Sequence, residues 1–185
     1  MVHGIKEIGP NRFRETFGRY FEEFKVGDIY EHRPGRTITQ TDNTWFTLLT
    51  MNQHPLHFDQ EYAGASEFGR ILVNSCLTLS LVTGMSVSDV SQKTVDNLGW
   101  DDVRLTGPVF VGDTLYAKSE VMEKRLSKSR EHEGIVRVRF QVFAGYRVER
   151  TQFPKIVRIF RFLACTNDFQ IQFGGYGHFP HHVHR

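Results

Sequence analysis

The chain has little cysteine, no long apolar run and no excess of either charge, and each shortage excludes a class of protein. Two cysteines in 185 residues, Cys76 and Cys165, lie in apolar runs and predict reduced, buried thiols in a cytoplasmic protein. No run approaches the roughly 18 apolar residues that a membrane helix needs, and the charged N-terminal residues lack the apolar core of a signal peptide. Basic and acidic residues nearly balance, 23 against 21, which argues against nucleic-acid binding by bulk charge.

What the chain does have is a length and composition suited to one globular domain. A chain of this length buries roughly 70% of its unfolded surface, so it can form a core without disulfides or a structural metal. Phenylalanine is abundant, at 16 residues, and predicts a large aromatic core. We expect a lead-in or a short helix over residues 1–17, a domain over 18–165 and a Gly- and His-rich tail over 166–185.

Three helical segments are predicted in the first half of the domain. Asp42 can cap a helix that runs to Leu49 with apolar residues at helical spacing, and Pro55 interrupts the helical pattern. A short second helix is predicted after Asp59. Every residue from 72 to 85 is apolar or small and none is charged, which predicts a helix buried on most faces.

The remainder of the domain predicts β-structure. Residues 136–142 alternate between apolar and polar side chains, the period of a half-buried strand. Further strands are predicted at 115–122 and 156–164, and a turn at Pro34-Gly35 precedes a short β-prone run. Because a helix without a polar face needs cover on several sides, we expect an α+β fold with a curved antiparallel sheet around the helix.

Several short motifs occur in an order that resembles one protein family. They are Tyr20-Phe21-Glu22, Val26-Gly27-Asp28, Thr37-Ile38-Thr39 with Asp42, Pro55-Leu56-His57-Phe58-Asp59, Phe68-Gly69 and Gly107-Pro108-Val109-Phe110-Val111-Gly112-Asp113. In this order they resemble the MaoC-like dehydratases and (R)-specific enoyl-CoA hydratases of the hot-dog fold. The resemblance spans roughly residues 18–165.

Two further motifs are most similar to one branch of that family, the mesaconyl-CoA and itaconyl-CoA hydratases. They are Thr50-Met51-Asn52 and Val73-Asn74-Ser75. The family resemblance implies a long central helix in a curved antiparallel sheet. It also implies a homodimer, or an assembly of such dimers, with active sites near the subunit interface.

The family pattern places an Asp and a His five residues apart around the reacting water. His57 matches the His, but Asn52 stands at the Asp position, and an amide can hydrogen-bond water without exchanging a proton. The unperturbed pKa of histidine, near 6.5, suits His57 to take a proton from the water. At the start of the buried helix, the Ser75 backbone N–H can stabilise an enolate oxygen. We take Asn74 and Asp42, together with Ser75, as candidates for substrate binding.

Three hypotheses remain for the group that protonates the α-carbon. In the first, His57 takes the proton from water and delivers it to the α-carbon on the same face. In the second, a carboxylate at Asp42 or Glu61 replaces the missing Asp. In the third, a carboxylate of the substrate takes part, which fits a dicarboxylic acyl-CoA.

Other polar residues carry weaker signals. His54 precedes Pro55 and favours an exposed position over a role in the site. Four C-terminal histidines lack cysteine or acidic neighbours, so we expect no metal site there; they are His178, His181, His182 and His184. Some basic residues should contact the phosphates of CoA, and the sequence does not choose among the candidates; these are Arg70, Arg104, Lys118, Lys124 and Arg125.

Together these patterns predict a cytoplasmic homodimer that reversibly hydrates a short enoyl-CoA thioester of the itaconyl-CoA or mesaconyl-CoA type. Coenzyme A enters as part of the substrate, and we expect no metal, no redox cofactor, no nucleic acid and no membrane partner. The alternatives are a straight-chain (R)-specific enoyl-CoA hydratase, a hot-dog thioesterase, and a non-catalytic acyl-CoA-binding protein or heterodimer subunit.

Overall fold

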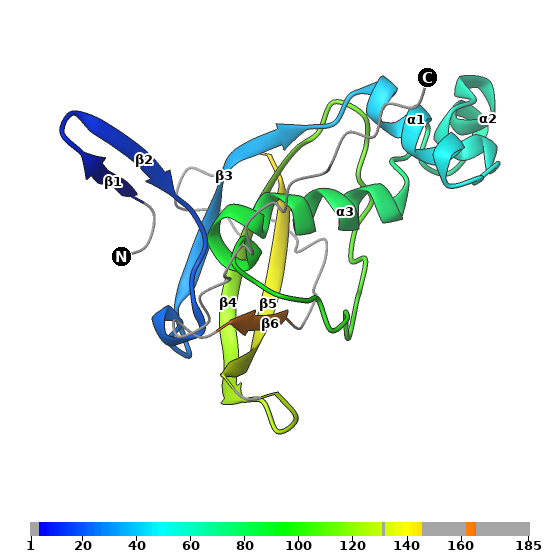
Figure 1. Ribbon diagram of the computed structural model, residues 1–185. Coiled ribbons are helices and arrows are strands. Elements are labelled where there is room, and N and C mark those ends of the chain that lie inside the picture. Colours follow the sequence, from blue (N-terminus) through cyan, green and yellow to red (C-terminus); the bar gives the residue numbers. More distant parts are fainter. Residues whose placement is uncertain (1–3, 131, 146–161, 166–185) are drawn as a thin grey trace, which may run out of the picture.

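A central helix packed on an antiparallel sheet forms the body of the molecule, as predicted. The computed structural model describes residues 4–130 and 132–145, and the backbone alone of 162–165. Helix α3 (Ser75–Ser86) lies across one face of a four-stranded sheet in the order β3-β4-β5-β6 (Figure 1). The strands, all paired antiparallel, are Ile29–Thr37, Thr114–Leu126, Glu133–Ala144 and Phe162–Cys165.

Strands β4 and β5 form the longest paired stretch of the sheet. The alternation of buried and less buried residues along them shows which face packs on α3. Every second residue is buried over 115–121 of β4 and 134–142 of β5, and because side chains alternate across a strand these residues share one face. That face packs with Leu77 and Val82 of α3 in a single apolar core. The core residues from β4 and β5 are Leu115, Ala117, Val121, Val136, Val138, Phe140 and Val142. The predicted strand at residues 136–142 is therefore confirmed.

Helices α1 (Gln40–Leu49) and α2 (Gln60–Ala65) lie beyond one end of the sheet, joined by the 3-10 turn η2 (Pro55–His57) (Figure 1). The N-cap of α1 is Thr39 and not Asp42, which is the third residue of a capping box. Asp59 caps α2 as expected, its side chain accepting the Tyr62 N–H. Both predicted helices are confirmed, with one cap corrected.

Helix α3 begins at Ser75, as expected, and keeps one face open. Asn74 is the N-cap, so residues 72 and 73 are extended and precede the helix. Cys76, Ser80 and Gly84, four residues apart, are exposed in the single chain. The expectation that Cys76 is buried is wrong, because Cys76 lies on this open face of α3. The helix continues into the π-helical turn η3 (Val87–Ser91).

Two local predictions from the N-terminal third are wrong. Residues 4–16 form a β-hairpin, β1 (Gly4–Gly9) with β2 (Arg12–Thr16), where a lead-in or short helix was expected. Pro34-Gly35 is not a turn, because β3 passes through it with a register shift between His32 and Arg36. A Cβ on Gly35 would lie 2.4 Å from the Tyr116 ring, so glycine permits this close approach. The short 3-10 turn η1 (Phe21–Glu23) follows the hairpin.

Some predictions concern residues outside the described part of the chain. Of the strand expected at 156–164, only its end falls on a described strand, β6. The C-terminal tail and its histidines lie outside the described residues, and the domain boundaries stay predictions. None of the helices in the described part of the chain has the length and apolar character that crossing a bilayer requires.

Candidate active site

The imidazole of His57 is held in one orientation by a backbone carbonyl. His57 is the last residue of η2, and its Nδ1 lies 2.9 Å from the carbonyl oxygen of Leu72. A carbonyl oxygen only accepts, so Nδ1 carries the proton in the neutral ring and Nε2 presents a lone pair. No residue in the described ranges bonds to Nε2. Nε2 is therefore the atom of His57 that can accept a proton from water.

Asn43, which the sequence reasoning missed, joins the segments that carry the site. This fully buried side chain lies one turn into α1. Its Nδ2 donates to the carbonyl oxygens of His57 (2.8 Å) and Leu72 (3.1 Å), and its Oδ1 accepts the Asn74 N–H (2.8 Å). One amide thus fixes the His57 turn, the carbonyl that orients the imidazole and the start of α3. The sequence carries no sign of this role, because Asn43 is a single polar residue within a predicted helix.

Asn52 shapes the turn that leads to His57. Its backbone N–H donates to the Thr47 carbonyl (3.0 Å), and its Oδ1 accepts the His54 N–H (2.9 Å). No other described residue bonds to its side-chain Nδ2. The Oδ1 acceptor of Asn52 is therefore used within the turn, and the Nδ2 donors remain available for a water or substrate oxygen. Its catalytic role stays a prediction.

The start of α3 offers an unbonded backbone N–H beside a small cavity. Asn74 is buried and uses its side chain to accept the Cys76 N–H (3.0 Å) and to donate to Thr47 Oγ1 (3.3 Å). The Ser75 N–H, by contrast, bonds to no described residue. Ser75 lines this small cavity with Leu72, whose carbonyl holds His57, and with residues 107–109. A helix N-terminus here can stabilise an oxyanion, with Asn74 shaping the helix start.

Asp42 is committed to local structure. Its Oδ2 accepts from the Thr39 N–H (2.8 Å) and hydroxyl (2.7 Å), and its Oδ1 accepts from Arg36 (2.9 Å). The Thr39 backbone hydrogen bond, chiefly, lowers the pKa of this carboxyl. A carboxylate so held is a poor proton donor near neutrality, and a substrate-binding role for Asp42 stays a prediction.

His54 lies closer to the site than expected, although it is exposed as predicted. Its ring centroid lies 5.9 Å from that of His57 and 5.9 Å from that of Tyr62. Its Nδ1 accepts the Leu56 N–H at 3.2 Å, so the proton of the neutral ring sits on Nε2. In the described ranges, no group of histidine, cysteine and acidic residues is arranged to hold a metal ion.

Comparison with known proteins supports the resemblance seen in the sequence. A family model described as "MaoC like domain" matches residues 22–143. The chain is 34% identical over 122 residues to a mesaconyl-CoA hydratase from Cereibacter sphaeroides, covering 66% of this chain and 35% of that protein. The chain thus spans about a third of the length of this curated relative.

Two solved structures show the same fold. One is a putative MaoC domain protein dehydratase from Chloroflexus aurantiacus, with a TM-score of 0.73 and 27% identity, matched over 82% of this chain and 41% of that one. The other, from Mycobacterium tuberculosis, is described as a double hotdog fold. Its TM-score is 0.69 at 21% identity, with 83% of this chain and 46% of that chain covered. The α+β body described above is therefore a hot-dog fold.

Proposed function

Because the chain belongs to the MaoC-like domain family, we propose that it reversibly adds water to a short enoyl-CoA thioester. The substrate class we favour is branched and dicarboxylic, of the mesaconyl-CoA or itaconyl-CoA type. The observation that carries the proposal is the geometry of His57. Its Nδ1 is held by Leu72, its Nε2 is open, and the unbonded Ser75 N–H lies three residues beyond Leu72. The ring of His54 lies beside that of His57, and the ring of Tyr62 lies beside that of His54.

In the proposed mechanism, His57 acts first as base and then as acid. Nε2 takes a proton from water while the water oxygen bonds to the β-carbon, and the electrons of the double bond move onto the thioester oxygen. The Ser75 N–H and the N-terminus of α3 stabilise the resulting enolate; losing one such donor typically costs about 10²–10³ in rate. The imidazolium then returns its proton to the α-carbon on the same face, which gives syn addition. No step needs a metal or a redox cofactor, and we expect neither.

Two other proton donors stay open. Glu61 lies on α2, in the first turn after the His57 segment. A carboxylate of the substrate is the other candidate, and it would explain why Asn52 can stand where a carboxylate is usual. Asp42 is the weaker member of this group, since hydrogen bonds and Arg36 hold its carboxylate ionised.

Loss of the ultraviolet absorbance of the conjugated thioester, with mass spectrometry of the products, tests the proposal. Mesaconyl-CoA and crotonyl-CoA are compared by absorbance, and itaconyl-CoA is incubated in parallel. We expect a water adduct from the dicarboxylic thioesters and little from crotonyl-CoA. An adduct formed equally well from crotonyl-CoA would favour the straight-chain hydratase. Release of free CoA, trapped by a thiol reagent, would mean a thioesterase, and binding without any product would mean a non-catalytic protein.

A further inference from the structure

The structure separates the basic residues among which the sequence could not choose. A CoA thioester carries phosphates, and a side chain that binds them should not already be neutralised by a carboxylate. Three of the five candidates are occupied. Arg104 pairs with Asp102 (2.6 Å), Arg125 with Glu123 (3.8 Å), and Lys124 donates to the carbonyls of Glu22 (3.2 Å) and Phe24 (3.0 Å). Arg70 and Lys118 remain, each without an acidic partner among the described residues.

Arg70 is exposed, yet it is held in place by an aromatic ring. Its guanidinium carbon lies 3.7 Å from the centroid of the Phe110 ring, a cation–π contact. Phe110 is itself fixed, because its N–H donates to Asp113 Oδ2 (2.9 Å) and it forms a β-bridge with Leu72. Stacking leaves the guanidinium N–H donors at the ring's edge available for a planar, bidentate contact with an anion.

Arg70 also lines an open hollow next to the His57 segment. The hollow is open to solvent and lies between the start of α1, helix α2 and residues 69–71. Helix α2 begins three residues after His57, and Leu72, which orients the imidazole, follows Arg70 by two residues. Two residues of extended chain span at most about 7 Å, so Arg70 is placed close to the backbone of the catalytic segment.

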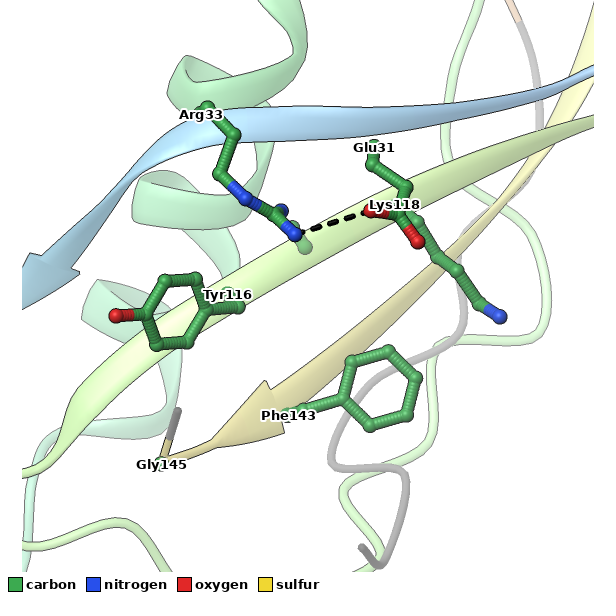
Figure 2. Close-up of a pocket in the computed structure, with 7 residues that line it drawn as sticks. Glu31, Arg33, Tyr116, Lys118, Phe143 and Gly145 are labelled. Carbon is green, nitrogen blue, oxygen red and sulfur yellow. Dashed lines mark hydrogen bonds and ion pairs between the residues drawn. The ribbon is translucent and has the colours of Figure 1, made fainter. Parts of the chain in front are cut away.

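Lys118 occupies a different part of the molecule. Its neighbours Ala117 and Ser119 are buried toward α3, so Lys118 points to the opposite face of the sheet. Figure 2 shows it in a hollow on that outer face, with the α3 ribbon behind the strands. The same hollow holds an ion pair between Glu31 and Arg33 (3.0 Å). Lys118 is therefore a matched control: a cation near an aromatic ring, but remote from the site.

We propose that Arg70 binds the phosphate groups of the CoA thioester at the hollow beside α2. The proposal rests on the proposed function, which supplies CoA as the substrate's carrier. Glu61 lines the same hollow and carries the opposite charge. A phosphate bound at Arg70 would be repelled by Glu61, so the two side chains should affect CoA affinity with opposite sign.

Calorimetric binding of unacylated CoA tests the assignment without requiring any turnover. Arg70→Gln should weaken CoA binding about 10-fold or more, the value of a charge-assisted hydrogen bond, and flatten its salt dependence. The CoA affinity of Arg70→Lys should fall between those of the wild type and Arg70→Gln, because lysine keeps the charge but lacks the planar guanidinium. Glu61→Gln should tighten binding, and Lys118→Gln should leave it unchanged.

The opposite results overturn the assignment. Equal losses from Arg70→Gln and Lys118→Gln would mean that only net charge matters, and unchanged binding in Arg70→Gln would remove Arg70 altogether. Pantetheine thioesters lack the phosphates of the nucleotide part of CoA. If Arg70→Gln slows turnover of mesaconyl-pantetheine while CoA binding stays intact, Arg70 instead binds the acyl carboxylate. A protein that binds CoA through Arg70 but hydrates no thioester would contradict the proposed function and leave this assignment standing.

Discussion

At the level of single residues, the His57 imidazole is oriented by a carbonyl oxygen rather than by a carboxylate. The Leu72 carbonyl accepts from both His57 Nδ1 and Asn43 Nδ2. A carbonyl partner only accepts, so it fixes the tautomer with the proton on Nδ1. The reactivity of His57 therefore depends on geometry, and that geometry depends on the buried amide of Asn43.

Asn43→Ala should lower kcat more than it raises KM. The substitution leaves the Asn74 N–H and the His57 carbonyl without their partner, at a stability cost of about 1–3 kcal/mol. The loosened imidazole should also shift the pH–rate profile, which steady-state kinetics across pH would measure. Thr41→Ala, on the exposed side of the same helix, is the control. A variant with lower thermal stability but wild-type kcat and pH profile would mean that Asn43 is only structural.

Asn52→Asp should change substrate preference. If the carboxylate of a dicarboxylic substrate takes part in the reaction, a second carboxylate at position 52 places like charges together and disfavours that substrate. We expect the ratio of kcat/KM for mesaconyl-CoA to that for crotonyl-CoA to fall by about one order of magnitude, equivalent to about 1.4 kcal/mol. A variant with an unchanged ratio would count against participation by the substrate carboxylate.

The sequence pointed to His57 and Asn52 because the short motifs around them resemble those of one family. It could not predict Asn43, since an asparagine on a helix contacts the site only after α1, η2 and α3 converge. It also could not choose Arg70, because the absence of a carboxylate partner is a property of the folded chain. The family motifs therefore predict candidate catalytic residues, whereas the residues that position them are found only from tertiary contacts.

At the scale of elements, a buried polar cluster fastens the end of α3 to the sheet. His32 on β3 is fully buried, with Nδ1 2.8 Å from Asp89 Oδ2 on η3 and Nε2 2.5 Å from Ser119 Oγ on β4. Arg19 donates to the Asp89 carbonyl oxygen and stacks on Tyr30. Burial raises the pKa of Tyr30 to about 12. Ser119, His32 and Asp89 are hydrogen-bonded in series. Because Ser119 and His32 are buried, this cluster serves to link β4, β3 and η3.

The buried His32 cluster makes the free energy of unfolding depend on pH. Burial lowers the pKa of His32, more than the hydrogen bond to Asp89 raises it, and the charges of Arg19 and Arg33 lower it further. The unfolded chain then binds a proton more readily than the folded one, so stability falls as pH drops below about 6.5 and levels off below the folded-state pKa. Carboxyls with lowered pKa, at Glu23 and Asp42, lose their contribution only at still lower pH.

Thermal unfolding between about pH 8 and pH 5 measures this dependence. We expect the wild-type Tm to fall through the lower half of that range. His32→Gln should have a lower Tm at pH 8 and a flatter profile, because the variant has no group to protonate there. Parallel profiles for both proteins would show that His32 does not set the pH dependence.

The predictions of elements failed where context overrides pattern. The apolar run over 72–85 predicted a helix buried on most faces, but the pattern does not say whether a second molecule covers Ser80 and Gly84. Pro34-Gly35 reads as a turn, whereas β4 continues opposite it and holds β3 through a bulge. Strand β5 was predictable because its apolar residues and its buried residues both recur at every second position.

At the scale of the whole molecule, large apolar side chains of α1 and the small open face of α3 are left uncovered in the single chain. Trp45, Leu48 and Leu49 are all more than half exposed. We propose that a second copy of the chain supplies the cover, which agrees with the homodimer expected from the sequence.

Light scattering coupled to size-exclusion chromatography tests the dimer. The account predicts a mass twice that of the 21.5 kDa chain. Ser80→Arg, which places a charged side chain on the open face of α3, should shift the protein toward monomer and reduce activity. Ser129→Arg, in the exposed loop between β4 and β5, should do neither. A wild-type monomer with full activity would contradict the dimer, as would a Ser80→Arg variant that stays dimeric.

The central claim is that one histidine, with no carboxylate at position 52, hydrates a CoA thioester. Mass spectrometry of mesaconyl-CoA incubated with wild-type protein and with His57→Gln tests it most directly. The account predicts a water adduct with the wild type. It predicts a rate at least about 10²-fold lower in the variant, with CoA binding unchanged, because the general acid–base group is lost. A His57→Gln protein that still forms the adduct at more than a few per cent of the wild-type rate would contradict the account.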